Sequence, residues 1–147
     1  WVEEAGLLDT LDDLGVGSIV FSPLAQGMLT DKYLKGVPED ARAANGKSLR
    51  PEFLADDTLA NIHALNEIAR NRGQTLAQMA LAWVLRGGRV TSALIGASRP
   101  SQIEDCLGAL ANREFSAEEL SEIDKYARDG NVNIWAASAE RSGPARK

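Results

Sequence analysis

The sequence has few of the residues from which disulfides and metal centres are built. Its 147 residues include one cysteine, Cys106, and one histidine, His63. A single cysteine excludes an intramolecular disulfide and a thiolate cage, and a single histidine leaves no histidine cluster for a metal ion. No metal site is therefore predicted. This cysteine usage best fits a reducing cytoplasm, which is the location that we predict.

Excess positive charge and long apolar runs are also lacking. The 16 Lys and Arg residues are outnumbered by 21 Asp and Glu residues, and the net charge is -5, which argues against nucleic acid as the main partner. The apolar runs are too short to span a bilayer, so no membrane partner is expected. The length fits one compact domain, or half of a larger fold of roughly 200 to 250 residues.

The chain begins with Trp1. Residues 1–14 have the pattern of an amphipathic helix and lack the basic start and uninterrupted apolar core of a signal peptide. We expect the native start to lie upstream of Trp1. The absence of a catalytic motif from these residues therefore says nothing about the rest of the protein.

Hydrophobic spacing predicts an α/β fold. The expected order is a helix over 1–15, a strand over 18–22, a loop over 24–56, two helices over 57–88, a strand over 90–95, two helices over 100–130 and a tail over 131–147. Because each strand is followed by helix, a parallel sheet is favoured. Two strands cannot form a sheet that is buried on both faces, so we expect a single partial domain that further chain completes.

Local signals mark several helix starts. Thr75 with Gln78 and Ser116 with Glu119 have the spacing of capping boxes, and Pro100 stands where the first turn of a helix tolerates proline. His63 lies off the apolar stripe of its helix and is interpreted as an ordinary, partly exposed histidine. Cys106 lies on an apolar stripe with Ile103, Leu107 and Leu110, which favours a small buried apolar side chain over a reactive thiol.

The segment 24–56 lacks periodicity and is punctuated by glycine and proline. It carries five basic residues, which are Lys32, Lys35, Arg42, Lys47 and Arg50. Compact domains rarely keep so long an irregular segment without a use, so a lid or binding loop is favoured. The alternative is a solvated excursion with scattered positive charge.

Two polar segments follow the predicted strands, Ser22-Pro23-Leu24-Ala25-Gln26-Gly27 and Gly96-Ala97-Ser98-Arg99-Pro100. In a (β/α)8 barrel the carboxyl ends of the strands carry the active site. Gly96 lets backbone approach a ligand, Ser98 and Arg99 offer donors, and free N–H groups of the next helix are expected to point the same way. An anion site is predicted here. The alternative is that serine and proline simply start a helix.

Three motifs carry a resemblance to a known family. They are Phe21 to Gly27, Thr75-Leu76-Ala77-Gln78-Met79-Ala80-Leu81-Ala82-Trp83, and Leu94-Ile95-Gly96-Ala97-Ser98-Arg99-Pro100-Ser101-Gln102-Ile103-Glu104. From Gly17 to Trp135 the sequence resembles the C-terminal half of the aldo-keto reductases. It is most similar to the branch that holds bacterial L-glyceraldehyde 3-phosphate reductases and potassium-channel β subunits.

The resemblance implies the C-terminal part of a (β/α)8 TIM barrel, with the strand at 18–21 as strand seven and the strand at 90–95 as strand eight. It also implies an oxidoreductase that uses NADPH to reduce small aldehydes or ketones to alcohols. The family's proton donor is a tyrosine tuned by Lys, His and Asp, and all four belong to the half that this chain lacks. Tyr33 and Tyr126 do not match that tyrosine, so no catalytic residue is assigned and the chain alone is expected to be inactive.

Cofactor contacts are implied residue by residue. Phe21 takes the place of the aromatic residue that stacks on the nicotinamide, and the segment after it would line the pyrophosphate through Ser22, Pro23, Leu24, Gln26 and Gly27. Lys32 matches a position that reaches the pyrophosphate, and Arg42 one that reaches the 2′-phosphate. The second segment would hold the 2′-phosphate and adenosine through Gly96, Ser98, Arg99 and Gln102, with Asp105 near the adenine.

One position departs from the family pattern. Cys106 stands where the family usually has an asparagine that contacts the adenine, and a thiol is a weak donor and acceptor, so adenine affinity is expected to be lower. An alternative to the enzyme is a non-catalytic NADPH-binding fragment or a regulatory module like a β subunit. The identity of the aldehyde or ketone and a homo-oligomeric state of the full-length protein stay open.

Overall fold

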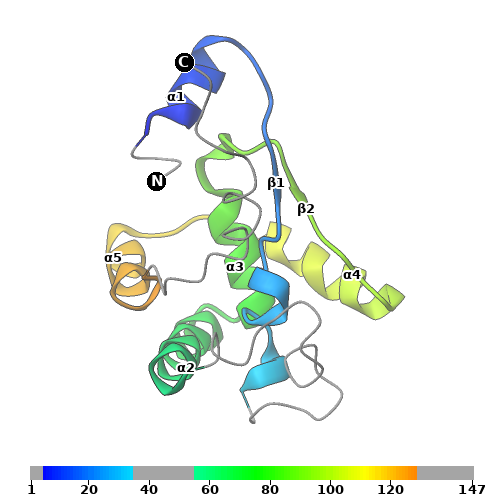
Figure 1. The fold of residues 1–147 in the computed structure, drawn as a ribbon, viewed down its shortest axis with the longest axis vertical. Helices are drawn as coiled ribbons and strands as arrows, with labels where there is room; N and C mark the ends of the chain where they lie inside the picture. The colour runs from blue at the N-terminus through cyan, green and yellow to red at the C-terminus, as the bar shows by residue number, and fades with distance from the viewer. Residues whose placement is uncertain (1–4, 35–54, 129–147) are drawn as a thin grey trace, which may run out of the picture.

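The computed structural model describes residues 5–34 and 55–128 (Figure 1). Arg42 and the predicted tail at 131–147 lie outside these residues. The helices are α1 (Leu7–Asp13), α2 (Asp56–Asn71), α3 (Leu76–Val84), α4 (Pro100–Leu107) and α5 (Ala117–Tyr126), and the strands are β1 (Ile19–Phe21) and β2 (Ser92–Leu94). Short 3-10 turns are η1 (Ala25–Gly27), η2 (Asp31–Tyr33), η4 (Arg86–Gly88) and η5 (Gly108–Ala111).

The two strands pair in parallel, which confirms the prediction from the element order. Val20 lies opposite Ala93, and Phe21 lies opposite Leu94. Both strands have three residues and are shorter than expected. The pairing differs just before β1. There the Ser18 N–H donates to the side-chain hydroxyl of Thr91 at 3.0 Å, and not to a backbone carbonyl of the neighbouring strand.

Both predicted capping boxes are present. The Thr75 hydroxyl accepts from the backbone N–H of Gln78 at 3.2 Å, and the Gln78 side-chain oxygen accepts from the N–H of Thr75 at 3.1 Å. Ser116 and Glu119 exchange the same two bonds at the start of α5. The boundaries of α3 and α5 therefore follow from local sequence.

Packing between helices forms the main core. One cluster joins α2, α3, α5 and the turns after β1 through Met28, Tyr33, Ile62, Leu65, Ala69, Leu76, Met79 and Ile123. A second cluster of Leu81, Ala82 and Ala109 is covered by side chains of β2 and α4. The sheet therefore rests on α3 and α4 by one face, while Phe21 and Leu94 on its other face are 61% and 62% exposed.

Several sequence-based expectations need correction. Residues 1–4 of the first predicted helix lie outside the described residues, and the described part of that helix is shorter than predicted. It runs over Leu7–Asp13, because Gly6 before it and Gly15 after it have positive φ angles of 69° and 63° and lie outside helical geometry. The loop predicted from residue 24 begins with the two 3-10 turns η1 and η2.

The apolar stripe of α4 also differs from the expectation of a buried face. Cys106 is only partly buried, and Ile103, Leu107 and Leu110 are 47%, 59% and 54% exposed. The reason is that α4 contacts α3 through Cys106 and Asp105, while the other residues of the stripe lie outside this contact. His63 is exposed, as predicted.

None of the helices in the described parts of the chain combines the length and the apolarity that a membrane crossing requires.

Candidate functional site

The parallel register brings two polar segments to one edge of the sheet. Phe21 ends β1 and pairs with Leu94, which ends β2. The segment from Ser22 to Gly27 and the segment from Gly96 to Pro100 therefore follow the sheet at neighbouring points, as Figure 1 shows. Phe21, which resemblance places under a nicotinamide ring, is exposed at this edge.

The first segment has a strained backbone. Ser22, Ala25 and Gln26 have φ angles of 55°, 46° and 59°, in the left-handed region that non-glycine residues seldom adopt. Each such residue costs on the order of 1 kcal/mol or more, and strain of this kind clusters at ligand sites. The turn is held by the Gly27 N–H, which donates to the Leu24 carbonyl at 2.8 Å.

Gln26 adds an unsatisfied polar atom to this segment. Its side-chain oxygen is buried and has no hydrogen-bond partner in the described residues. A buried acceptor without a donor costs about 1 to 3 kcal/mol. The segment thus has a strained backbone and a spare acceptor at the point where the sequence predicted a binding loop.

The second segment is organised by Gln102. Its side-chain oxygen accepts from the N–H of Ser98 at 2.8 Å, from the Ser98 hydroxyl at 3.2 Å and from the N–H of Arg99 at 3.2 Å. An amide three residues into α4 thus satisfies the N–H groups of Ser98 and Arg99, which precede the helix. Within the described residues, the Gln102 side-chain NH2 group has no partner. Gly96, Ser98, Arg99 and Gln102 are all exposed.

Asp105 and Cys106 lie further along α4, toward α3. The Asp105 carboxylate accepts from the side-chain NH2 of Gln78 at 2.9 Å and from the Thr75 hydroxyl at 3.4 Å. Burial, and secondly the nearby Asp105 charge, raises the pKa of the Cys106 thiol. The thiol therefore stays protonated and is a weak hydrogen-bonding group at neutral pH.

Lys32 lies in η2, after the first segment. Its backbone N–H donates to the Thr30 hydroxyl at 3.2 Å, which caps this short turn, and the residue is exposed. No cluster of three or more His, Cys, Asp or Glu side chains that would hold a metal ion is present in residues 5–34 and 55–128.

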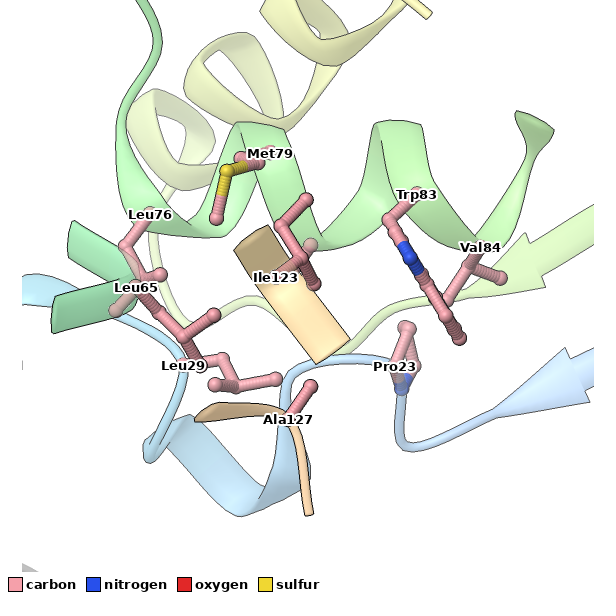
Figure 2. A pocket seen from close by; sticks show the side chains of 10 residues that line it. Pro23, Leu29, Leu65, Leu76, Met79, Trp83, Val84, Ile123 and Ala127 are labelled. Atoms are coloured by element: carbon pink, nitrogen blue, oxygen red, sulfur yellow. The ribbon is translucent and has the colours of Figure 1, made fainter. Parts of the chain in front are cut away.

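An apolar pocket that sequence reasoning missed lies behind the first segment (Figure 2). It opens between that segment, α2, α3 and α5, with Pro23 and Trp83 at one end and Leu65 and Leu76 at the other. The indole nitrogen of Trp83 is buried and lacks a partner in the described residues. Pro23, predicted as a cofactor residue, therefore also anchors the segment on the core.

Sequence reasoning also missed Gln78 as a link between helices. Its capping role was readable from the spacing to Thr75, but its bonds to Asp105 join positions 27 residues apart. A glutamine whose oxygen serves the cap has its NH2 group left for another partner. That was the one signal in the sequence for this contact.

Comparison with known proteins shows the family of the chain. The profile of the Aldo/keto reductase family matches residues 1–128, and the chain belongs to that family. It is 50% identical over 145 residues to the L-glyceraldehyde 3-phosphate reductase of Escherichia coli strain K12. The aligned residues make up 96% of this chain and 42% of that protein. It is 42% identical over 110 residues to an Arabidopsis thaliana protein named "Probable voltage-gated potassium channel subunit beta". Here the aligned residues make up 73% of this chain and 34% of that protein.

A solved structure shows a similar fold. The glycerol dehydrogenase of Gluconobacter oxydans superimposes with a TM-score of 0.63 and 25% sequence identity, over 81% of this chain and 36% of that protein. The chain thus spans less than half the length of these relatives. It is an α/β chain of the Aldo/keto reductase family, and its two strands end where the polar segments begin.

Proposed function

We propose that this chain is the NADPH-binding, C-terminal part of an aldo-keto reductase that reduces small aldehydes or ketones to alcohols. Its strands β1 and β2 would be strands seven and eight of a (β/α)8 barrel. The observation that carries the proposal is the parallel pairing of Phe21 with Leu94, which brings both polar segments to one edge. Active sites of such barrels are built at that edge.

The residues at this edge fit a dinucleotide phosphate. The exposed Phe21 offers an aromatic face for a nicotinamide ring. Arg99 and Lys32 are exposed cations near the two segments, and Arg binds phosphate through paired hydrogen bonds. NADPH, when bound, would supply the hydride, while these residues would hold and orient it.

The chain does not supply the proton donor in this proposal. Tyr33 is 1% exposed and lies in the helical core, and Tyr126 ends α5, away from the sheet. Upstream chain would contribute the Tyr, Lys, His and Asp. The relative named L-glyceraldehyde 3-phosphate reductase makes a small phosphorylated aldehyde the first substrate to test.

A second candidate is a regulatory NADPH-binding subunit. It is favoured by the similarity to a protein named as a potassium channel subunit. Such a subunit would bind NADPH at the same edge of the sheet but would not catalyse its oxidation. A homo-oligomer of the full-length protein, a small-molecule carbonyl substrate and a cytoplasmic location belong to the main proposal. Nucleic acid and membrane are not among its partners.

The two candidates separate in one experiment on the complete gene product. NADPH binding is measured by titration, and NADPH consumption is followed with glyceraldehyde 3-phosphate and with short unphosphorylated aldehydes. Binding with aldehyde-dependent consumption supports the reductase. Binding without consumption of any aldehyde favours the regulatory subunit. An absence of NADPH binding contradicts both.

A further inference from the structure

The side chain of Gln78 joins the start of α3 to the second half of α4. Its NH2 group donates to the Asp105 carbonyl oxygen at 3.0 Å and to the Asp105 carboxylate at 2.9 Å. Its oxygen accepts from the Thr75 N–H at 3.1 Å. Every polar atom of this amide is therefore engaged, and we name the contact the Gln78–Asp105 bridge.

The bridge needs the space that glycine at position 108 leaves free. A Cβ added there would lie 2.5 Å from the Gln78 nitrogen and 3.0 Å from its amide carbon. Gly108 has an ordinary helical φ of -57°, so the constraint on this position is space and not backbone conformation. Because the amide is held by three hydrogen bonds, it cannot move aside without losing some of them.

The same helix orders the second polar segment. Asp105 lies one turn after Gln102 on α4, so the two side chains share a helix face. Gln102 holds the N–H groups of Ser98 and Arg99. One end of α4 is thus fixed on α3 by Asp105, and the other end shapes the turn that presents the Ser98 hydroxyl and the Arg99 guanidinium.

The negative charge of Asp105 gives the Gln78–Asp105 bridge a second effect, on phosphate binding. Asp105 is an acidic group on the helix whose N-terminal turn would face the phosphate, and a like charge near a phosphate weakens its binding. The bonds from Gln78 and Thr75 hold both carboxylate oxygens on the α3 side. An unheld carboxylate would be able to swing toward the segment that carries Ser98.

We propose that Gln78 is a positioning residue for cofactor selectivity: through the Gln78–Asp105 bridge it keeps the Asp105 charge on α3 and fixes the α4 turn that receives the 2′-phosphate. The inference rests on the proposed function, since it concerns the same cofactor edge. Gln78 itself touches no cofactor in this proposal.

The test uses Gln78→Glu in the complete gene product. Glutamate at this position keeps the capping box, because its carboxylate still accepts from the Thr75 N–H, but it replaces the bridge by two facing carboxylates. NADPH affinity should fall about tenfold, because the Asp105 carboxylate is no longer held on α3 and its charge lies closer to the bound phosphate. NADH affinity should fall by a smaller factor, because NADH has no 2′-phosphate.

The rescue variant is Gln78→Glu combined with Asp105→Asn. It has the net charge of the unmodified protein, and the amide introduced on α4 donates to the carboxylate introduced on α3, so the bridge is rebuilt with reversed polarity. The ratio of NADPH to NADH affinity should return toward that of the unmodified protein. Asn71→Asp, at the exposed end of α2, adds the same charge outside the bridge and should leave the ratio unchanged.

Each result decides the inference. Equal weakening of NADPH and NADH by Gln78→Glu, or a double variant no more selective than the single one, overturns it while the proposed function stands. An unmodified protein that binds no NADPH overturns both. If Gln78→Glu does not fold, as judged by thermal unfolding, Gly108→Ala crowds the same amide with no charge change and should lower the NADPH to NADH ratio. An unaltered ratio there also overturns the inference.

Discussion

The guanidinium of Arg72 lies over the ring of Phe115, with its central carbon 3.7 Å from the ring centroid. The Arg72 side chain is 3% exposed and donates to the Glu119 carboxylate at 2.6 Å. It also donates to the carbonyl oxygens of Asn112 and Glu114. One buried cation thereby ties the end of α2 to the start of α5 and to the chain that precedes it.

Replacement of Arg72 by Ala should destabilise the protein strongly. The substitution removes the stacking contact and the donor to the Glu114 carbonyl and the Glu119 carboxylate, while the Asn112 carbonyl keeps its bond from Gln74. We expect a loss of about 2 to 4 kcal/mol. The free energy of unfolding from denaturant titration measures it. Arg70→Ala is the matched control, since Arg70 forms an exposed pair with Glu67 and should change stability by about 0.5 kcal/mol or less. Equal effects of the two changes would contradict the role given to Arg72.

The same cluster predicts a dependence of stability on pH. The backbone N–H of Ser116 first, and Arg72 second, lower the pKa of Glu119 below that of a free carboxyl group. A carboxyl group with a lowered folded-state pKa stabilises the fold above its unfolded pKa, about 4.3, and loses this contribution as the pH falls through the folded pKa.

Glu119→Gln should therefore flatten the fall in stability below about pH 5. Unfolding curves at several pH values between neutral and acidic conditions measure this slope. Glu67→Gln, at an exposed position of α2, serves as the control for loss of a carboxylate. If the stability of the Glu119→Gln variant falls with decreasing pH as steeply as that of the unmodified protein, the Glu119 carboxylate does not contribute in this way.

Gly17 permits a close approach of the chain to Thr91. A Cβ at Gly17 would lie 2.8 Å from the Thr91 hydroxyl oxygen, which accepts from the Ser18 N–H. Gly17→Ala should cost about 1 to 3 kcal/mol through overpacking at the start of the strand pair. The cost should shrink in a Thr91→Ala background, where the clashing hydroxyl is gone. Gly96→Ala is the stability control, because a Cβ there meets nothing within 4 Å.

Features that depend on short sequence separations were predictable. The capping boxes at Thr75 and Ser116 involve positions three apart, and the structure contains both. The role of Gln102 is of the same local kind, because an amide three residues after the N-cap of a helix reaches back to the N–H groups before it. The sequence contained that signal, but the interpretation gave Gln102 only the cofactor contact that the resemblance implies.

Features that depend on distant partners were not predictable from one sequence. Arg72 and Glu119 are 47 positions apart, and Gln78 and Asp105 are 27 apart. Neither periodicity nor composition states which helix will lie against which. The exposure of Leu107 is a related case, since the apolar stripe shows which residues can be buried and not what covers them.

The last prediction concerns the choice of cofactor. If Ser98 and Arg99 hold the 2′-phosphate, Arg99→Ala in the complete gene product should weaken NADPH by roughly 1.5 to 3 kcal/mol, through loss of a charge-assisted hydrogen bond. NADH should bind almost as before, because its ribose has no phosphate at that position. The preference for NADPH should thus fall by about one to two orders of magnitude.

The control for this prediction is Arg113→Ala, which removes an exposed arginine outside the second segment and should leave the preference unchanged. Arg42 was predicted from the resemblance to share the same phosphate, so the double replacement of Arg42 and Arg99 should lower the preference further. Parallel titrations with NADPH and NADH give the preference for each variant. If Arg99→Ala lowers the affinities for NADPH and NADH equally, the Arg99 guanidinium contacts a group that both cofactors contain, such as the pyrophosphate. The 2′-phosphate would then have to be held by another cation, while the membership of the chain in its family would be unaffected.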